Sequence, residues 1–277
     1  MGEMVQIATA DVRQMNGATR THIDLFSGIG GFALACRWAG IETIAFCEIE
    51  PYAQQVLRKN FPGIRIFEDV RQFPANEFCE PFLLTGGYPC QPFSQAGKRR
   101  GAKDDRHLWP SMFGIIRTSR PNWILAENVA GHVTLGLDEV LADLESEDYA
   151  VQPIIVPACA VDAPHRRDRV WILGNSERDS GNASREIAFA DSNIKRLEGQ
   201  TSKRIQKAER RENKFCNEFS SRGCRGGARL WSAEPNVGRV AHGIPRRVDR
   251  LRGLGNAIVP QVAYEIFKAM IEADESA

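Results

Sequence analysis

No stretch of the 277-residue chain is apolar for long enough to cross a membrane. A membrane-spanning helix needs about 20 mostly apolar residues in a row, and every apolar run in this sequence is shorter. The segment from Met1 to Arg20 also lacks the apolar core of a signal peptide. We therefore expect a cytoplasmic protein with no membrane partner.

Cysteine and histidine are few, and they are not spaced as metal ligands. The chain has seven Cys and five His, and no two Cys are separated by two residues. Without such pairs the sequence predicts no structural metal and no disulfide framework, and it favours a reducing compartment. The cysteines are Cys36, Cys47, Cys79, Cys90, Cys159, Cys216 and Cys224.

Charge is nearly balanced over the whole chain but not along it. The net charge is +1, whereas residues 193–231 hold 11 Lys and Arg against 4 Asp and Glu. A basic segment beside a mildly acidic remainder is typical of an enzyme core that carries a polyanion-binding region. A solvated basic loop is the alternative on this observation alone.

Short apolar runs alternate with helical patterns over residues 1–174, which predicts an α/β domain with a parallel sheet covered on both faces. Helices are expected at Phe32–Ala39, Pro51–Phe61 and Leu135–Leu144, and over Ile258–Ile271, which Pro260 opens. The predicted strands are Thr21–Phe26, Thr43–Cys47, Ile64–Phe67, Phe82–Thr85, Trp123–Ala126, Val151–Pro157 and Arg169–Leu173.

The remaining residues divide into an insert and a returning segment. Residues 175–238 are polar, basic and rich in loop-forming residues, and they predict a small insert with little core of its own. Apolar order returns in residues 239–277, which we expect to pack on the first domain.

A glycine-rich turn follows the first predicted strand, and acidic residues follow the next two. The turn contains Gly28, Gly30 and Gly31, whose backbone can turn tightly and approach a ligand at a helix N-terminus. Glu48, some 20 residues after the turn, is suited to accept ribose hydroxyls. Asp69 is suited to accept from an exocyclic amine. Together they predict an adenosine-type cofactor pocket, whereas a lone glycine turn would predict only tight packing.

The most informative stretch is Gly86–Ser94, which reads GGYPCQPFS. It places Cys90 on a rigid loop directly after the fourth predicted strand, where open α/β sheets build their sites. Glu127 ends the fifth strand at the same edge of the sheet. Arg167 and Arg169 adjoin the last strand, where they can bind phosphate, a carbonyl oxygen or acidic groups of the protein.

In this order, these blocks resemble the cytosine-5 DNA methyltransferase family. The resemblance covers nearly the whole chain except about 175–231, and the length fits prokaryotic or phage members. One residue departs from it, because His165 stands where the family usually has Gln. The matching blocks are Asp24–Phe32, Glu48, Asp69–Val70, Gly86–Ser94, Glu127–Val129, the pair Arg167 and Arg169, and Arg250–Gln261.

The resemblance implies a Rossmann-like, S-adenosylmethionine-dependent methyltransferase sheet with a small, basic, loop-rich target-recognition region. It implies that the Cys90 thiolate adds to C6 of cytosine and that Glu127 hydrogen-bonds N3 and the 4-amino group. Arg169 would support O2 of the ring and orient Glu127, with Arg167 in the same catalytic group. The methyl group then passes from S-adenosylmethionine to C5.

The resemblance also implies the residues that bind cofactor and DNA. Those expected to bind the cofactor are Phe26, Gly28, Gly30, Gly31, Glu48, Ile49, Asp69, Val70, Pro89, Asn256 and Ala257. Those expected to contact DNA lie on a mobile loop after the nucleophile and are Ser94, Lys98, Arg99, Arg100 and Arg106.

The partner implied is double-stranded DNA, from which the target base must be flipped. A restriction endonuclease that acts on the same site without stable association is a further expected partner, in restriction-modification or in phage or host DNA protection. Methylation of a tRNA cytosine, which one branch with these motifs performs, is the alternative substrate. A catalytically inactive DNA-binding paralogue and a nicotinamide dehydrogenase are the alternatives from other classes.

Overall fold

The computed structural model describes residues 19–89, 108–134, 136–163, 165–176 and 247–276. Within these ranges, no helix combines the length and the apolar character needed to span a membrane.

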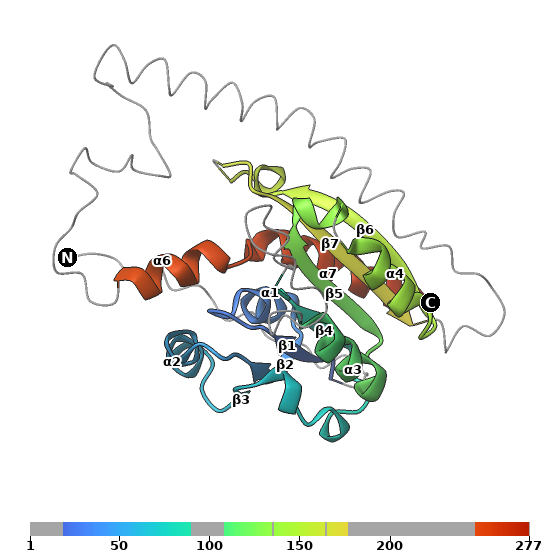
Figure 1. Ribbon diagram of the computed structural model, residues 1–277, viewed down its shortest axis with the longest axis horizontal. Helices are drawn as coiled ribbons and strands as arrows, with labels where there is room; N and C mark the ends of the chain where they lie inside the picture. Colours follow the sequence, from blue (N-terminus) through green and yellow to red (C-terminus); the bar gives the residue numbers. More distant parts are fainter. Residues whose placement is uncertain (1–18, 90–107, 135, 164, 177–246, 277) are drawn as a thin grey trace, which may run out of the picture.

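The described residues form one seven-stranded sheet with the order β3-β2-β1-β4-β5-β7-β6 (Figure 1). All seven strands predicted from the sequence are confirmed, with ends that differ by up to three residues. The strands are β1 (Thr21–Leu25), β2 (Glu42–Cys47), β3 (Arg65–Phe67), β4 (Leu83–Gly86), β5 (Trp123–Val129), β6 (Tyr149–Pro157) and β7 (Asp168–Ser176).

The prediction of a parallel sheet is wrong for one strand. β1 to β5 run in one direction, but β7 pairs antiparallel with both β5 and β6. Residues 158–167 are all that joins β6 to β7. A parallel crossover needs about a dozen residues or more, usually with a helix, so this short connection favours the antiparallel pairing.

The predicted helices are confirmed with small shifts of their ends, and two more are present. Gly40, at φ 74°, ends the first helix in the left-handed conformation that favours glycine. The helices not predicted are α3, which follows the basic loop, and α6, whose Gly253 and Gly255 lower helix propensity. The helices are α1 (Gly31–Ala39), α2 (Pro51–Asn60), α3 (Trp109–Ser119), α4 (Leu137–Glu145), α6 (Arg247–Asn256) and α7 (Pro260–Glu275).

Four short 3₁₀ turns connect these elements within the described residues. They are η1 (Val70–Gln72), η2 (Ala75–Glu77), η3 (Ala130–Thr134) and η4 (Ala158–Val161).

Buried side chains cover both faces of the sheet, as predicted. On one face α1 and α7 pack together, and Phe32 lies edge-on to Trp171 with ring centroids 6.1 Å apart. On the other face α3 and α4 pack, with Met112 fully buried. Successive side chains of β4 point to opposite faces of the sheet and so contribute to both layers of the core, because side chains alternate along a strand. Each large apolar side chain buried in this way stabilises the fold by about 1.5–3 kcal/mol.

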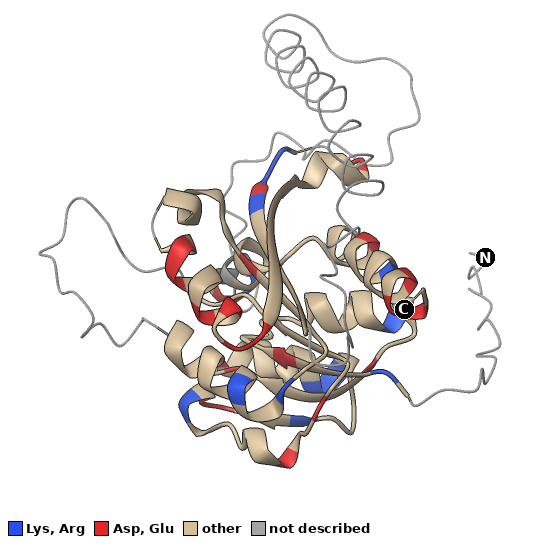
Figure 2. Cartoon of the chain, turned by 90° about the vertical axis from the view of Figure 1, so that its right-hand side faces the viewer, with Lys and Arg blue, Asp and Glu red and all other residues tan. Residues whose placement is uncertain are grey.

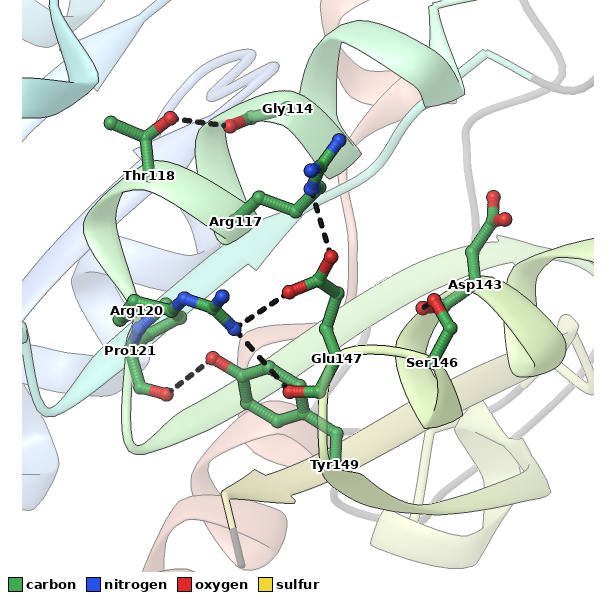
Figure 3. Close-up of polar contacts among 9 residues, drawn as sticks. All are labelled: Gly114, Arg117, Thr118, Arg120, Pro121, Asp143, Ser146, Glu147 and Tyr149. Atoms are coloured by element: carbon green, nitrogen blue, oxygen red, sulfur yellow. Dashed lines mark hydrogen bonds and ion pairs between the residues drawn. The ribbon is translucent and has the colours of Figure 1, made fainter. Parts of the chain in front are cut away.

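An ion-pair cluster ties the beginnings of β5 and β6 together (Figure 3). Glu147 accepts from Arg117 Nε at 2.8 Å through Oε1 and from Arg120 Nη1 at 2.7 Å through Oε2. The Tyr149 hydroxyl donates to the carbonyl oxygen of Pro121 at 2.8 Å. These contacts join the end of α3 to the end of α4, at the edge of the sheet opposite to the carboxyl ends of β1 to β5.

Charged residues of the described part are interspersed, with Lys and Arg among Asp and Glu (Figure 2). The basic excess predicted for residues 193–231 falls outside the described residues, as does the insert from residue 177 onward.

A buried polar network crosses the middle of the sheet. The His22 ring lies 2.9 Å from Thr43 Oγ1 through Nδ1 and 2.8 Å from Thr85 Oγ1 through Nε2. The Thr85 hydroxyl donates to Asp24 Oδ1 at 2.9 Å. Because Thr85 gives its proton to Asp24, a neutral His22 that donates from Nε2 satisfies the chain of contacts. Burial lowers the pKa of His22 to about 3 and raises the pKa of Asp24 to about 8.

The two pKa shifts make the stability of the fold change with pH in opposite directions. The protonated Asp24 of the folded chain contributes stability that is lost as pH rises from about 3.8 towards 8. The neutral His22 contributes stability that is lost as pH falls from about 6.5 towards 3. Between pH 6.5 and 8, Asp24 alone of the two changes its contribution.

We predict that the free energy of unfolding falls by about 1–2 kcal/mol between pH 6.5 and 8 because of Asp24. In Asp24→Asn, which keeps the neutral form at all pH values, this part of the decline should disappear. Urea titrations of both proteins at the two pH values measure the difference, with Asp138→Asn, a change at an exposed acid, as the control. An unchanged decline in Asp24→Asn would show that Asp24 is already ionised in the folded chain.

Candidate active site

A cavity of about 500 Å³ opens where β1 to β5 end. Volumes of this size are usual for sites that hold a cofactor or a small molecule. Twelve of the residues that the sequence singles out lie in its wall, together with others. They are Phe26, Gly28, Gly31, Glu48, Ile49, Asp69, Val70, Pro89, Glu127, Arg169, Asn256 and Ala257.

The glycine-rich turn after β1 forms one end of the cavity. Phe26 and Gly28 both have φ 54°, a left-handed conformation that costs free energy at a residue with a side chain. Ser27 holds the turn, since its hydroxyl donates to Asp24 O at 2.6 Å and its N–H to Cys47 O at 3.0 Å. The turn places Gly31, the first residue of α1, in the wall of the cavity.

Gly30 is the one predicted cofactor residue that is absent from the described wall of the cavity. It has φ 86°, and a Cβ there would lie 2.6 Å from Phe61 Cε2 and 3.0 Å from Leu57 Cδ2. The geometry therefore places Gly30 against α2, where it allows α1 and α2 to pack closely.

Glu48 fixes the turn from the neighbouring strand end. Its Oε2 accepts from the Gly28 N–H at 2.6 Å, and its Oε1 accepts from the Glu50 N–H at 2.7 Å. Burial raises the pKa of Glu48, although these two backbone donors lower it in part. Each carboxylate oxygen has a second lone pair, so Glu48 can still accept from hydroxyl groups of a ligand in the cavity.

Asp69 stands at the end of β3 and begins the turn η1. Its carboxylate accepts from the Arg71 N–H at 3.0 Å and from Arg71 Nη2 at 2.8 Å. The Arg71 side chain thereby lowers the pKa of Asp69 below its usual value. Nearby, Ile49 leaves 65% of its surface exposed, which gives this part of the cavity an apolar face.

The other end of the cavity is built from the loop after β4 and the end of β5. Asn128 donates from Nδ2 to the carbonyl oxygen of Tyr88 at 3.2 Å, and so ties the loop to β5. The Tyr88 hydroxyl lies 2.7 Å from His132 Nε2, which anchors the same loop on η3. Gly87 lies against the carboxylate of Glu127, with the position of a Cβ only 3.6 Å from Oε2.

Glu127 is a buried carboxylate held by one guanidinium. Its Oε1 accepts from Arg169 Nε at 2.8 Å, and only 11% of its side chain is exposed. Burial raises the pKa of Glu127 above its usual value, although Arg169 and Arg167 lower it in part. A carboxyl group with a raised pKa holds its proton more readily, and it can donate that proton to a group on which negative charge develops.

Arg167 takes a different position from Arg169. It precedes β7, has φ 42°, and is absent from the described wall of the cavity. Its Nη2 donates to the carbonyl oxygens of Gly255 at 2.9 Å and Ala257 at 2.7 Å. The geometry thus separates the two arginines that the sequence groups together.

Several predicted site residues fall outside the described residues. The proposed nucleophile Cys90 is among them, although the preceding Pro89 lines the cavity. The predicted DNA contacts Ser94, Lys98, Arg99, Arg100 and Arg106 lie outside as well.

The cavity also contains residues that the sequence does not single out as ligands. Among them are Glu50, Tyr52, Glu68, Leu108, Asp249 and Gly253. Glu50 and Glu68 closely follow strands, so position after a strand end is the signal that could have found them.

Comparison with known proteins identifies the family. The family model described as C-5 cytosine-specific DNA methylase matches residues 20–230. The chain belongs to this family. Enzymes of the family use S-adenosylmethionine as methyl donor, and the described fold is the α/β sheet expected for them.

Individual relatives match only part of this chain. It is 36% identical over 166 residues to the type II methyltransferase M2.BsuMI of Bacillus subtilis (strain 168), covering 57% of this chain and 42% of the relative. It is 42% identical over 112 residues to M.NgoMIV of Neisseria gonorrhoeae, covering 40% of this chain and 36% of the relative. The chain thus spans less than half the length of either relative.

Among solved structures, a mutant of Spodoptera frugiperda DNMT2 matches with a TM-score of 0.50 and 23% identity. The match covers 60% of this chain and 53% of that one. At this identity the likeness concerns the fold alone.

We predict that Gly30→Ala destabilises the chain by about 2–4 kcal/mol, because its Cβ meets the buried side chains of Phe61 and Leu57 and its φ is strained. The matched change Gly28→Ala has a similar left-handed φ but open space around the Cβ, and should cost about 1 kcal/mol. Urea unfolding of the two variants measures the difference. Equal losses would contradict the assignment of Gly30 to packing.

Proposed function

We propose that this chain is a DNA (cytosine-5-)-methyltransferase that transfers a methyl group from S-adenosylmethionine to C5 of a cytosine flipped out of duplex DNA. The observation that carries the proposal is that the two ends of one cavity hold different kinds of functional groups. One end has the turn and acids suited to a nucleoside, and the other has the Glu127–Arg169 pair beside the loop that leads to Cys90.

The residues of the first end fit S-adenosylmethionine. Glu48 has acceptor capacity for ribose hydroxyls, and Asp69 can accept from the exocyclic amine of adenine. Ile49 and Val70 offer apolar contacts for the adenine ring, and Asn256 and Ala257 line the wall contributed by the C-terminal segment. The bound cofactor would supply an electrophilic methyl group.

The residues of the second end fit cytosine. Glu127, with its raised pKa, would donate a proton to N3 while its other oxygen accepts from the 4-amino group. Arg169 would hydrogen-bond O2 of the ring while it keeps Glu127 in position. Both groups stabilise the negative charge that forms on the ring when a nucleophile adds to it.

Cys90 would supply that nucleophile. Its thiolate would form a bond to C6, which raises the electron density at C5 so that C5 can take the methyl group as the S–CH3 bond of the cofactor breaks and a neutral thioether leaves. A base then removes the proton from C5, the C6–S bond breaks and the thiolate leaves. Pro89 and Pro92, which flank Cys90 in the sequence, would hold the Cys90 loop.

Duplex DNA is the proposed partner. Ser94, Lys98, Arg99, Arg100 and Arg106 would contact its backbone, and residues 175–238 would read its bases. Unstacking a base costs a few kcal/mol, which such contacts would offset. A cytoplasmic location and a restriction endonuclease that acts on the same DNA sequence complete the proposal.

Labelled methyl transfer tests this function. With S-adenosylmethionine labelled in its methyl group, we expect label in duplex DNA as 5-methylcytosine and little or none in tRNA. Cys90→Ser should reduce the rate at least about a thousandfold because it removes the nucleophile. The exposed Cys79 gives the control, since Cys79→Ser should methylate at the rate of the parent.

Label found in tRNA and not in DNA would show that tRNA is the substrate and would contradict the proposal of duplex DNA. Equal rates for Cys90→Ser and the parent would rule out the covalent mechanism. Bisulfite sequencing of DNA from cells that express the chain would then give the target sequence.

A further inference from the structure

The C-terminal segment supplies one wall of the cofactor end of the cavity. Gly253, Gly255, Asn256, Ala257 and Ile258 all line it, and they belong to the end of α6 and its connection to α7. More than 200 residues of chain separate this wall from the glycine-rich turn, so its position depends on tertiary contacts.

Two close contacts set the wall against the turn. Ile258 lies on Gly31, with its Cγ1 2.6 Å from the position of a Cβ at Gly31. Gly253 approaches Ile29 in the same way, with 3.2 Å between a Cβ position and Ile29 Cγ2. The first contact requires glycine at position 31 and the second leaves little room for a side chain at position 253, so a small displacement of the connection would change the shape of the cavity.

Arg167 holds the same connection from the other side. One nitrogen, Nη2, donates to two carbonyl oxygens that lie two residues apart, those of Gly255 and Ala257. The carbonyl groups at the end of a helix lack partners within the helix and carry partial negative charge, so a guanidinium suits them. The backbone at this point is held by the Ala158 N–H, which donates to the carbonyl oxygen of Arg166 at 2.7 Å and to that of Arg167 at 3.3 Å.

Arg169, two residues further on, holds Glu127 at the other end of the cavity. The short segment from Arg167 to Arg169 therefore contacts both the wall of the cofactor end and the carboxylate of the base end. The left-handed φ of 42° at Arg167 is a conformation that few residues with side chains adopt.

We propose that Arg167 is a positioning residue that fixes the α6–α7 connection as the wall of the cofactor site, and does not act on the base. The inference rests on the proposed function, because it takes S-adenosylmethionine as the ligand of the cavity. It assigns cofactor affinity to Arg167 and the chemical step to its neighbour Arg169.

Binding of S-adenosylmethionine to the whole chain without DNA, measured by calorimetry, tests the proposal. We expect Arg167→Gln to weaken binding by roughly tenfold or more, because two hydrogen bonds from a charged donor are lost. Arg167→Lys keeps the charge but not the planar geometry of the guanidinium, and should fall between the parent and the Gln variant. Arg166→Ala, which removes the neighbouring exposed guanidinium, should bind as the parent does.

Two further readouts distinguish positioning from a general loss of structure. In methyl transfer, Arg167→Gln should raise KM for S-adenosylmethionine with kcat at saturation little changed, whereas Arg169→Gln should lower kcat. Hydrogen exchange at the Ala257 N–H, which donates to Gly253 O at 3.1 Å, should become faster in Arg167→Gln and stay unchanged in Arg166→Ala.

Each outcome has a distinct meaning. Parent affinity in both Arg167 variants would overturn the inference and leave the proposed function standing. A parent chain that binds no S-adenosylmethionine would overturn the proposed function and the inference with it. If Arg167→Gln does not fold, Arg167→Lys decides the matter, and parent affinity in that variant would overturn the inference.

Discussion

The common direction of β1 to β5 is the constraint on which the rest of the structure depends. Because these strands are parallel, their carboxyl ends meet at one edge of the sheet. The turn after β1, Glu48 after β2, Asp69 after β3, the loop after β4 and Glu127 near the end of β5 are thereby brought into one cavity. The ion-pair cluster around Glu147 secures the opposite edge, so the residues that stabilise β5 and β6 do not compete with those that line the site.

The pKa of the carboxyl group at each end of the cavity is raised by burial and lowered in part by nearby hydrogen-bond donors. At Glu127, removal from water raises the pKa while Arg169 lowers it, and the balance leaves the carboxyl group able to carry a proton. Glu48 has the same balance with backbone N–H groups in place of a guanidinium. In the proposed chemistry Glu48 would accept from ribose hydroxyls through the lone pairs that its backbone donors leave available, whereas Glu127 would donate to the ring nitrogen of cytosine.

Much of this arrangement can be predicted from the sequence, because apolar runs bounded by turn residues locate strands and acids after strands locate a site. The hydrophobic pattern does not indicate the direction of β7, since a strand buried on both faces has the same pattern whether it runs parallel or antiparallel to its neighbours. The sequence predicts that Gly30 binds the cofactor, whereas its packing against α2 depends on the position of Phe61, which no local pattern contains. The contact of Arg167 with Gly255 and Ala257 joins residues almost 90 positions apart, which no local pattern predicts. The role of Cys90 stays a prediction of the sequence, strengthened by the place of Pro89 in the cavity wall.

Trapping of a covalent complex tests the central claim most directly, which is that Cys90 attacks a cytosine held by Glu127 and Arg169. Duplex DNA in which 5-fluorocytosine replaces cytosine lacks the C5 proton whose loss would release the enzyme. Incubated with the chain and S-adenosylmethionine, such DNA should give a complex that survives denaturation, and mass spectrometry of its peptides should place the link on Cys90. No complex, or a link on another cysteine such as Cys47, would contradict the account.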